Sequence, residues 1–186
     1  MVMTEKVTDM MMPRLCKIVM SLCVAIFALC VTFNNIVDYD SNYQFVRHVM
    51  SMDTVFPDNR LLHRAVNIED LWHVCYWLII AAEGVTAILL LYGTLSLWRK
   101  RRASAPQFYR AKKWIYAGAT AGFITWFFGF MVIGGEWFLM WQSADWNGQE
   151  AAFKFYLTII GVLLFVHQPD AELPSRHCKT VSDETG

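Results

Sequence analysis

Residues 72–98, WHVCYWLIIAAEGVTAILLLYGTLSLW, form an apolar stretch in which Glu83 is the one acidic residue. A helix needs about 20 such residues to cross the ~30 Å hydrocarbon core of a bilayer. Three further stretches, residues 15–37, 113–134 and 148–166, meet the same requirement. Because backbone polar groups must be hydrogen-bonded within lipid, the sequence predicts an all-α membrane protein with four transmembrane helices.

The composition agrees with a membrane protein and limits the function. The chain of 186 residues is 56% hydrophobic and 17% charged, whereas soluble domains are roughly 45–50% apolar and 25% charged. Sixteen basic and 16 acidic residues give a net charge of zero, which excludes a general nucleic-acid binder. We expect an N-terminal arm at residues 1–13, one four-helix domain at 14–168 and a flexible tail at 169–186.

The distribution of Lys and Arg predicts how the spans are oriented. Seven of these residues lie in the loop at 99–113, and none lies in the loop at 135–149. Basic loops stay on the cytoplasmic side of the membrane. The sequence therefore predicts that both termini are cytoplasmic and that the loops at 38–71 and 135–149 face outward.

The first outer loop is long enough to hold a helix of its own. Ser41 and Gln44 have the spacing of a capping box. The residues that follow place their apolar side chains on one helical face. We expect a short amphipathic helix that lies on the outer membrane surface or caps the bundle. Its apolar residues are Phe45, Val46, Val49, Met50 and Met52.

Polar residues recur at similar depth in the outer third of the predicted membrane. At 1.5 Å per residue, Glu83 lies roughly 8 Å and Lys154 roughly 10 Å from the outer boundary. Their opposite charges predict that they pair or share a network. This layer is either a small cavity that binds an ion, a head group or a quinone, or a structural pair that fixes helix register. Its candidate residues are Asn34, Asn35, Glu83, Glu136 and Lys154.

Histidines in the outer segments raise the question of a metal site. We consider His48, Asp53 and His73 candidate ligands at the outer face, although their spacing matches no compact metal motif. Surface histidines without a metal are the alternative. The sequence contains no phosphate-binding glycine loop, nucleophile elbow or haem-attachment motif, so it assigns no cofactor.

Two outer segments carry a recognisable pattern. They read NNIVDYxSNxxFVxHVxSMD at residues 34–53 and GGEWFxMWQS at residues 134–143, the latter followed by WNGQ at 146–149. The pattern resembles a bacterial domain-of-unknown-function family described as predicted small integral membrane proteins, over roughly residues 12–174. The resemblance implies four membrane spans in a bacterial inner membrane and implies no activity.

We therefore predict a non-enzymatic accessory, assembly or binding subunit in the bacterial inner (cytoplasmic) membrane. The alternative is a small-solute or ion transporter that uses the polar layer, although four spans without an internal repeat are few for alternating access. A membrane redox, metal or quinone-binding protein is the third hypothesis. The expected partners are the lipid bilayer and either another membrane protein or further copies of the chain, not nucleic acid.

Overall fold

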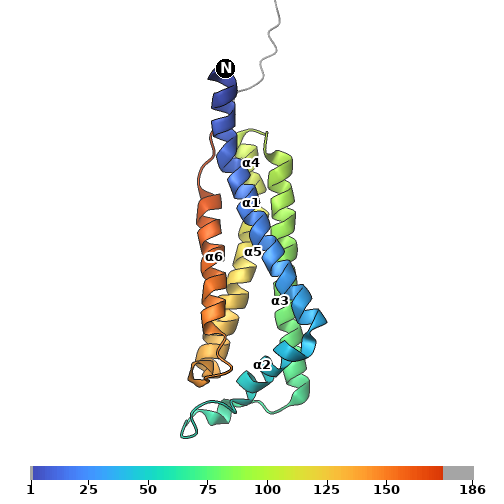
Figure 1. Ribbon diagram of the computed structural model, residues 1–186, viewed down its shortest axis with the longest axis vertical. Coiled ribbons are helices and arrows are strands. Elements are labelled where there is room, and N and C mark those ends of the chain that lie inside the picture. Colours follow the sequence, from blue (N-terminus) through green and yellow to red (C-terminus); the bar gives the residue numbers. More distant parts are fainter. Residues whose placement is uncertain (1, 174–186) are drawn as a thin grey trace, which may run out of the picture.

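The computed structural model describes residues 2–173, and within that range the chain is helical with short connections (Figure 1). The turn-like elements η1 and η3 are short 3₁₀ helices, and η2 is a π-helix. In chain order the elements are α1 (Val2–Val37), α2 (Tyr39–Ser51), η1 (Leu62–Arg64), α3 (Glu69–Lys100), α4 (Ala105–Ala111), α5 (Lys113–Phe123), η2 (Ile124–Trp137), η3 (Met140–Gln142) and α6 (Gln149–His167).

Four helical segments are long and apolar enough to cross a membrane, which confirms the predicted fold class. Each contains all or nearly all of one stretch predicted from the sequence and continues into the more polar residues beside it. The third is built from α4, α5 and η2 in succession. The four segments are Thr8–Val37, Glu69–Lys100, Ala105–Trp137 and Gln149–His167.

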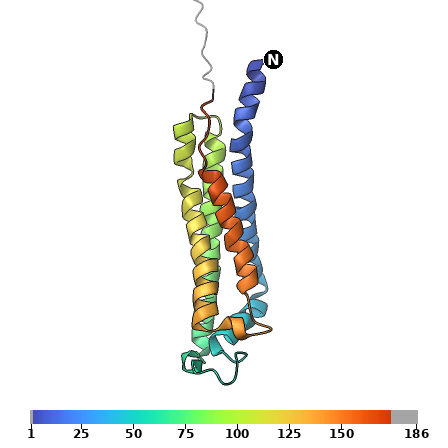
Figure 2. The ribbon, with the colours of Figure 1, turned by 90° about the vertical axis from the view of Figure 1, so that its left-hand side faces the viewer.

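The four long segments form a closed bundle (Figures 1 and 2). Helix α1 packs on α3, α3 on α5, α5 and η2 on α6, and α6 returns to α1. We call the end with α2, η1 and η3 the loop end. The opposite end, with α4 and residues 168–173, is the tail end, and both ends of the described chain lie there.

Glycines bring α3 and α5 close together. A Cβ atom added to Gly93 of α3 would lie 2.8 Å from the backbone nitrogen of Ile115. A Cβ added to Gly118 of α5 would lie 3.0 Å from the backbone nitrogen of Leu90. Small residues allow helix backbones to approach in membranes, where packing replaces the hydrophobic effect as the source of association.

The third segment changes its winding partway along. Residues Ile124–Trp137 form a π-helix, and the amide of Phe138 donates to the carbonyl of Ile133, five residues back, at 3.0 Å. Extended π winding is rare and is often found near functional sites. The glycine pair Gly134 and Gly135 does not end the helix, which continues to Trp137.

Helix α2 lies across the loop end and packs mainly against α3. It begins at Tyr39, so the predicted capping box at Ser41 lies within the helix rather than at its start, and Asp38 at the N-cap makes no side-chain capping bond. The side chains of Tyr43, Val46 and Met50 are buried on one face. That α2 also lies on the outer membrane surface stays a prediction.

A network of buried charges closes the tail end. The Lys17 Nζ donates to Asp170 Oδ1 at 2.8 Å, and the Lys112 Nζ lies 2.5 Å from Asp170 Oδ2. Both lysine side chains and the Asp170 side chain are at most 1% exposed. Both lysines also donate to the carbonyl of Gln168.

Arg14 extends this network to the connection between α3 and α4. It is fully buried, and its guanidinium donates to the carbonyls of Arg101, Ala103 and Ala171 at 2.6–3.1 Å. The first residues of the predicted flexible tail are thus bound to the bundle. The remainder of that tail, residues 174–186, and the start of the predicted arm lie outside the described residues.

Candidate functional site

Glu83 is a buried carboxylate in the half of the bundle nearer the loop end. It lies in the middle of α3, and only 2% of its surface is exposed. Its Oε2 accepts a 2.7 Å hydrogen bond from the Nδ2 of Asn35 on α1. Within residues 8–173 no Lys, Arg or His forms an ion pair with it. A buried carboxylate held by a neutral amide is unusual, because burying a charge without an opposite charge is expensive.

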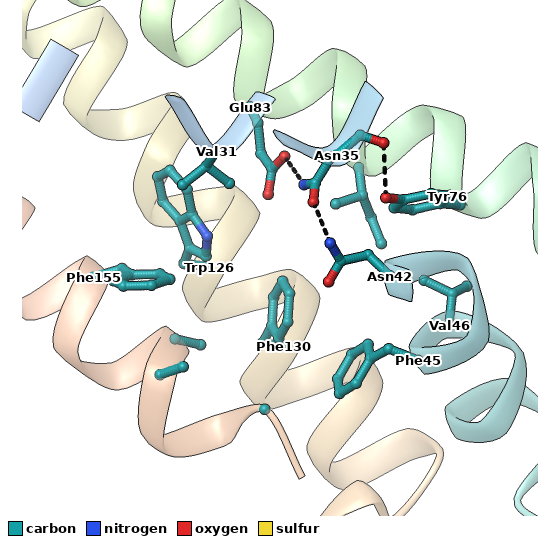
Figure 3. A pocket seen from close by; sticks show the side chains of 14 residues that line it. Val31, Asn35, Asn42, Phe45, Val46, Tyr76, Glu83, Trp126, Phe130 and Phe155 are labelled. Carbon is teal, nitrogen blue, oxygen red and sulfur yellow. Dashed lines mark hydrogen bonds between the residues drawn. The ribbon is translucent and has the colours of Figure 1, made fainter. Parts of the chain in front are cut away.

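Asn35 organises the surrounding polar groups (Figure 3). Its Oδ1 accepts from the Nδ2 of Asn42 on α2 at 2.8 Å, and its backbone carbonyl accepts from the Tyr76 hydroxyl at 3.0 Å. The order of donation is therefore from Asn42 to Asn35 and from Asn35 to Glu83. This chain of bonds connects three helices and fixes the orientation of the Glu83 carboxylate.

The local structure of α1, α2 and α3 brings these residues together. The chain bends at Asp38, between α1 and α2, so that Asn42 folds back toward Asn35. On α3, Tyr76 and Glu83 are seven residues apart and therefore share a helical face. The polar cluster thus follows from one bend and one regular helix.

Next to Glu83 lies a half-open cavity of about 240 Å³. All four membrane segments and α2 contribute to its wall, and aromatic rings make up much of that wall (Figure 3). Trp126 lies only 5.7 Å, ring centre to ring centre, from Phe155, and Phe45 lies 6.0 Å from Phe130. The lining residues are Val31, Asn35, Asn42, Phe45, Val46, Tyr76, Ile79, Glu83, Trp126, Phe130, Gly148, Ala151, Ala152 and Phe155.

Two polar atoms in the cavity wall belong to buried residues and have no hydrogen-bond partner in the described part of the chain. One is Oε1 of Glu83, the oxygen that Asn35 does not bind. The other is the indole nitrogen of Trp126, a residue that is 1% exposed. Both atoms face the inside of the cavity in Figure 3. The cavity therefore offers a carboxylate acceptor and an N–H donor to a bound molecule.

The predicted pairing of Glu83 with Lys154 is wrong. The Lys154 Nζ instead donates to Glu150 at 2.7 Å, four residues earlier on α6, and their side chains are 66% and 81% exposed. Lys154 follows the buried Ala152 by two positions, so it projects from α6 roughly 200° away. Lys154 is therefore on the outside of the bundle, away from Glu83.

Two other predicted residues of the polar layer lie away from the cavity. Asn34 and Glu136 are exposed, and neither lines the cavity. Asn34 precedes the buried Asn35 and faces outward, whereas Glu136 is near the end of η2. Of the five candidates, the structure brings together Asn35 and Glu83.

The candidate outer-face ligands separate into two groups. The Nδ1 of His48 lies 2.8 Å from Asp53 Oδ2, and its ring stacks on Trp146 at 4.5 Å. His73 instead contacts Tyr39, with 2.8 Å between its Nδ1 and the hydroxyl oxygen. Burial raises the pKa of Tyr39, so its hydroxyl keeps its proton at neutral pH and can donate to His73. Over residues 8–173 no group of three His, Cys, Asp or Glu residues is arranged to hold a metal ion.

The sequence prediction missed several residues that the structure places in the site. Tyr76 lies seven residues before the predicted Glu83 on α3, and that spacing was a usable signal. Asn42 lies on a different helix from Asn35, and only the bend at Asp38 brings the two together. Trp126 was distinguished by being a tryptophan in the middle of a span, away from the interfaces where tryptophans gather. The remaining aromatic lining carries no signal that separates it from ordinary core residues.

The fold and the cavity define a small four-helix integral membrane protein with a largely aromatic pocket beside a buried glutamate. The chain belongs to the family described as predicted small integral membrane protein (DUF2165), whose model matches residues 13–169. Comparison with curated proteins and comparison with solved structures find no significant match.

Proposed function

We propose that the protein is a non-enzymatic binding subunit of the bacterial inner membrane that holds a small ligand in the Glu83 pocket. The observation that carries the proposal is the buried Glu83 carboxylate, whose Oε1 has no partner within residues 8–173 and faces a cavity. The Oε1 atom is accessible from the cavity rather than sealed in the core, so a molecule in the cavity can supply its missing hydrogen-bond donor.

A binding role agrees better with the pocket than a transport role. A transporter would need a polar route from Glu83 to the tail end. The buried residues between them are mainly apolar, among them Ala25, Ala87 and Leu90. Transport stays the alternative, and uptake of the identified ligand into proteoliposomes would support it.

The lipid-facing surface leaves room for partners. Large apolar side chains such as Val85, Ile88 and Leu164 are half or more exposed on the outside of the bundle. Lipid covers such residues in a membrane, and a partner protein or a second copy of the chain can replace it. We propose an accessory or assembly role on this surface, with binding of the small ligand in the pocket.

We also propose that the tail end faces the cytoplasm, since the basic loop at residues 99–113 lies there. Single cysteines at the exposed positions Arg102 and Asp58, in a chain without its native cysteines, test this orientation. A membrane-impermeant maleimide should label position 58 in intact cells and position 102 only after the cells are opened. The reverse pattern would overturn the orientation.

A thermal-stability screen tests the pocket itself. The purified protein is heated with members of several ligand classes: inorganic cations, organic amines, quinones and anions. A molecule that binds only the folded state raises the apparent Tm. Val31 lines the cavity, and Val31→Phe should fill it and remove the response. Val19→Phe on the same helix, at a position that is 56% exposed outside the cavity, should keep it.

The screen has a clear negative outcome. If no class raises the Tm of the wild-type protein more than that of Val31→Phe, the cavity is not a ligand site and the proposal is wrong.

A further inference from the structure

The lining of the pocket specifies the charge of its ligand. Among the 14 lining residues, Glu83 is the one acidic residue, and none is Lys, Arg or His. The nearest charged group predicted to compensate it, Lys154, pairs with Glu150 outside the bundle. A positive charge on the ligand would therefore supply what the described protein residues do not.

The aromatic wall distinguishes an organic cation from a metal ion. Five rings surround the cavity, and ring faces attract alkylated ammonium groups through their quadrupole. Calcium or magnesium would need about six or more oxygen ligands. The side chains of the cavity wall offer fewer oxygens than that, namely those of Glu83, Asn35, Asn42 and Tyr76, and the Asn35 Oδ1 already accepts a bond from Asn42. The rings belong to Phe45, Tyr76, Trp126, Phe130 and Phe155.

Size and the second polar atom narrow the ligand further. The cavity of about 240 Å³ is below the roughly 300–1,000 Å³ of pockets for drug-sized ligands. The unpartnered indole N–H of Trp126 can donate to an acceptor on the same molecule. A compact ammonium group with a nearby oxygen would contact Glu83 through its charge and accept a hydrogen bond from the Trp126 indole N–H through its oxygen.

We propose that the pocket binds a small alkylammonium group, with Glu83 as its counter-ion and the aromatic rings as its cage. This inference rests on the proposed ligand pocket and names the chemistry of its ligand. The ammonium group belongs either to a free amine or to the head group of a lipid, and both present the same chemistry to Glu83.

The sharpest test compares two probes that differ in charge and share their shape. Choline and 3,3-dimethylbutan-1-ol differ by exchange of the quaternary nitrogen for carbon. Binding is measured by titration calorimetry on the full chain in a maltoside detergent, which carries no ammonium group. We expect choline to bind at least about tenfold more tightly than the alcohol, since a desolvated cation–π contact alone is worth about that much.

Matched variants connect the binding to Glu83. Glu83→Gln keeps the shape of the side chain and removes its charge, and it should lower the affinity for choline at least about tenfold. Glu136→Gln removes an exposed carboxylate that does not line the cavity and should leave affinity unchanged. Phe45→Leu removes one ring of the cage without altering the carboxylate, and it should also lower the affinity for choline. Thermal melts show whether each variant is folded, so that a folding failure of one variant leaves the others to decide.

A lipid arm separates the two sources. Protein reconstituted with phosphatidylethanolamine or with phosphatidylglycerol is released and weighed by native mass spectrometry. If the ligand is a lipid, the wild-type protein should retain phosphatidylethanolamine, and choline should displace it. The Glu83→Gln variant should not retain this lipid. A free-amine source predicts no retained lipid and an unchanged affinity for choline in both membranes.

Several results would overturn the inference. Equal affinity for choline and the neutral alcohol, or choline binding that survives Glu83→Gln, would contradict it. If only a quinone or an inorganic cation raises the Tm, and this rise is lost in Val31→Phe, the pocket is a ligand site but its ligand is not an ammonium group. If no ligand raises the Tm of the wild-type protein more than that of Val31→Phe, both the ligand pocket and the ammonium ligand are refuted.

Discussion

The two ends of the bundle each bury a carboxylate, and they treat it in opposite ways. At the tail end, Asp170 contacts Lys17 and Lys112, and the side chains of all three are at most 1% exposed. Nearer the loop end, Glu83 has one amide partner, no counter-charge among the described residues, and an adjoining cavity. The first carboxylate is compensated within the protein, and the second is open to a ligand.

This difference separates a charge that the protein itself compensates from one that we propose to be compensated by a ligand. The tail-end network joins α1, the connection after α3, the start of α5 and the chain after α6. It fastens the last described residues to the bundle. Predictions that remove one charge at a time should therefore change stability at the tail end and ligand binding at the pocket.

The largest effect on stability should come from Asp170→Asn. This change leaves Lys17 and Lys112 buried without a carboxylate, and breaking a buried pair in this way costs about 3–5 kcal/mol. Unfolding in mixed micelles measures it. Glu172→Gln is the control, since the Glu172 carboxylate accepts one exposed bond from the Ala105 amide. Equal losses for the two variants would mean that Asp170 is not central to the tail end.

Asn35→Ala should have the next largest effect. It removes the bonds to Asn42 and Glu83 and leaves the buried Glu83 carboxyl group without its hydrogen-bond donor, which costs about 1–3 kcal/mol. The same unfolding assay measures the loss. Asn34→Ala alters the exposed neighbour on the same turn and should be silent. If Asn34→Ala is the more damaging change, the described hydrogen-bond chain does not organise the site.

Glu83→Gln should change stability little, within about 1 kcal/mol, because it replaces a buried carboxyl group that has no counter-charge among the described residues and keeps an acceptor for Asn35. Chemical denaturation of the ligand-free protein measures this. A loss as large as that of Asp170→Asn would show that Glu83 has a structural partner after all and would abolish the contrast between the two ends.

The smallest effect is expected for Lys154→Gln. Its ion pair with Glu150 is exposed and joins neighbouring turns of one helix, and such pairs contribute little. The apparent Tm should stay unchanged within experimental error. A large loss would restore the rejected pairing of Lys154 with Glu83, because that variant would then leave a buried carboxylate alone.

The sequence predicted the four spans and two residues of the polar cluster, Asn35 and Glu83. Span positions follow from apolar length, and Glu83 stood out as a charge that topology does not explain. Lys154 was assigned wrongly because depth along a helix was matched without the helical face. Asn42 joined the site through a bend at Asp38, which the predicted capping box placed too late in the chain.

The tail-end network was beyond a reading of local patterns. Asp170 lies in a polar segment beside Pro169, which is typical of a flexible tail. Its partners are more than 50 residues away in sequence, and Lys17 and Lys112 resembled the other basic residues that mark orientation. Burial of these charges depends on tertiary packing that no single segment determines.

Infrared difference spectroscopy tests the central claim most directly, that the Glu83 carboxylate is the ligand-binding charge. Adding choline to the protein in maltoside should perturb a carboxyl band. We predict that this change disappears in Glu83→Gln and persists in Glu136→Gln. A choline-induced carboxyl band that survives in folded Glu83→Gln would contradict the account.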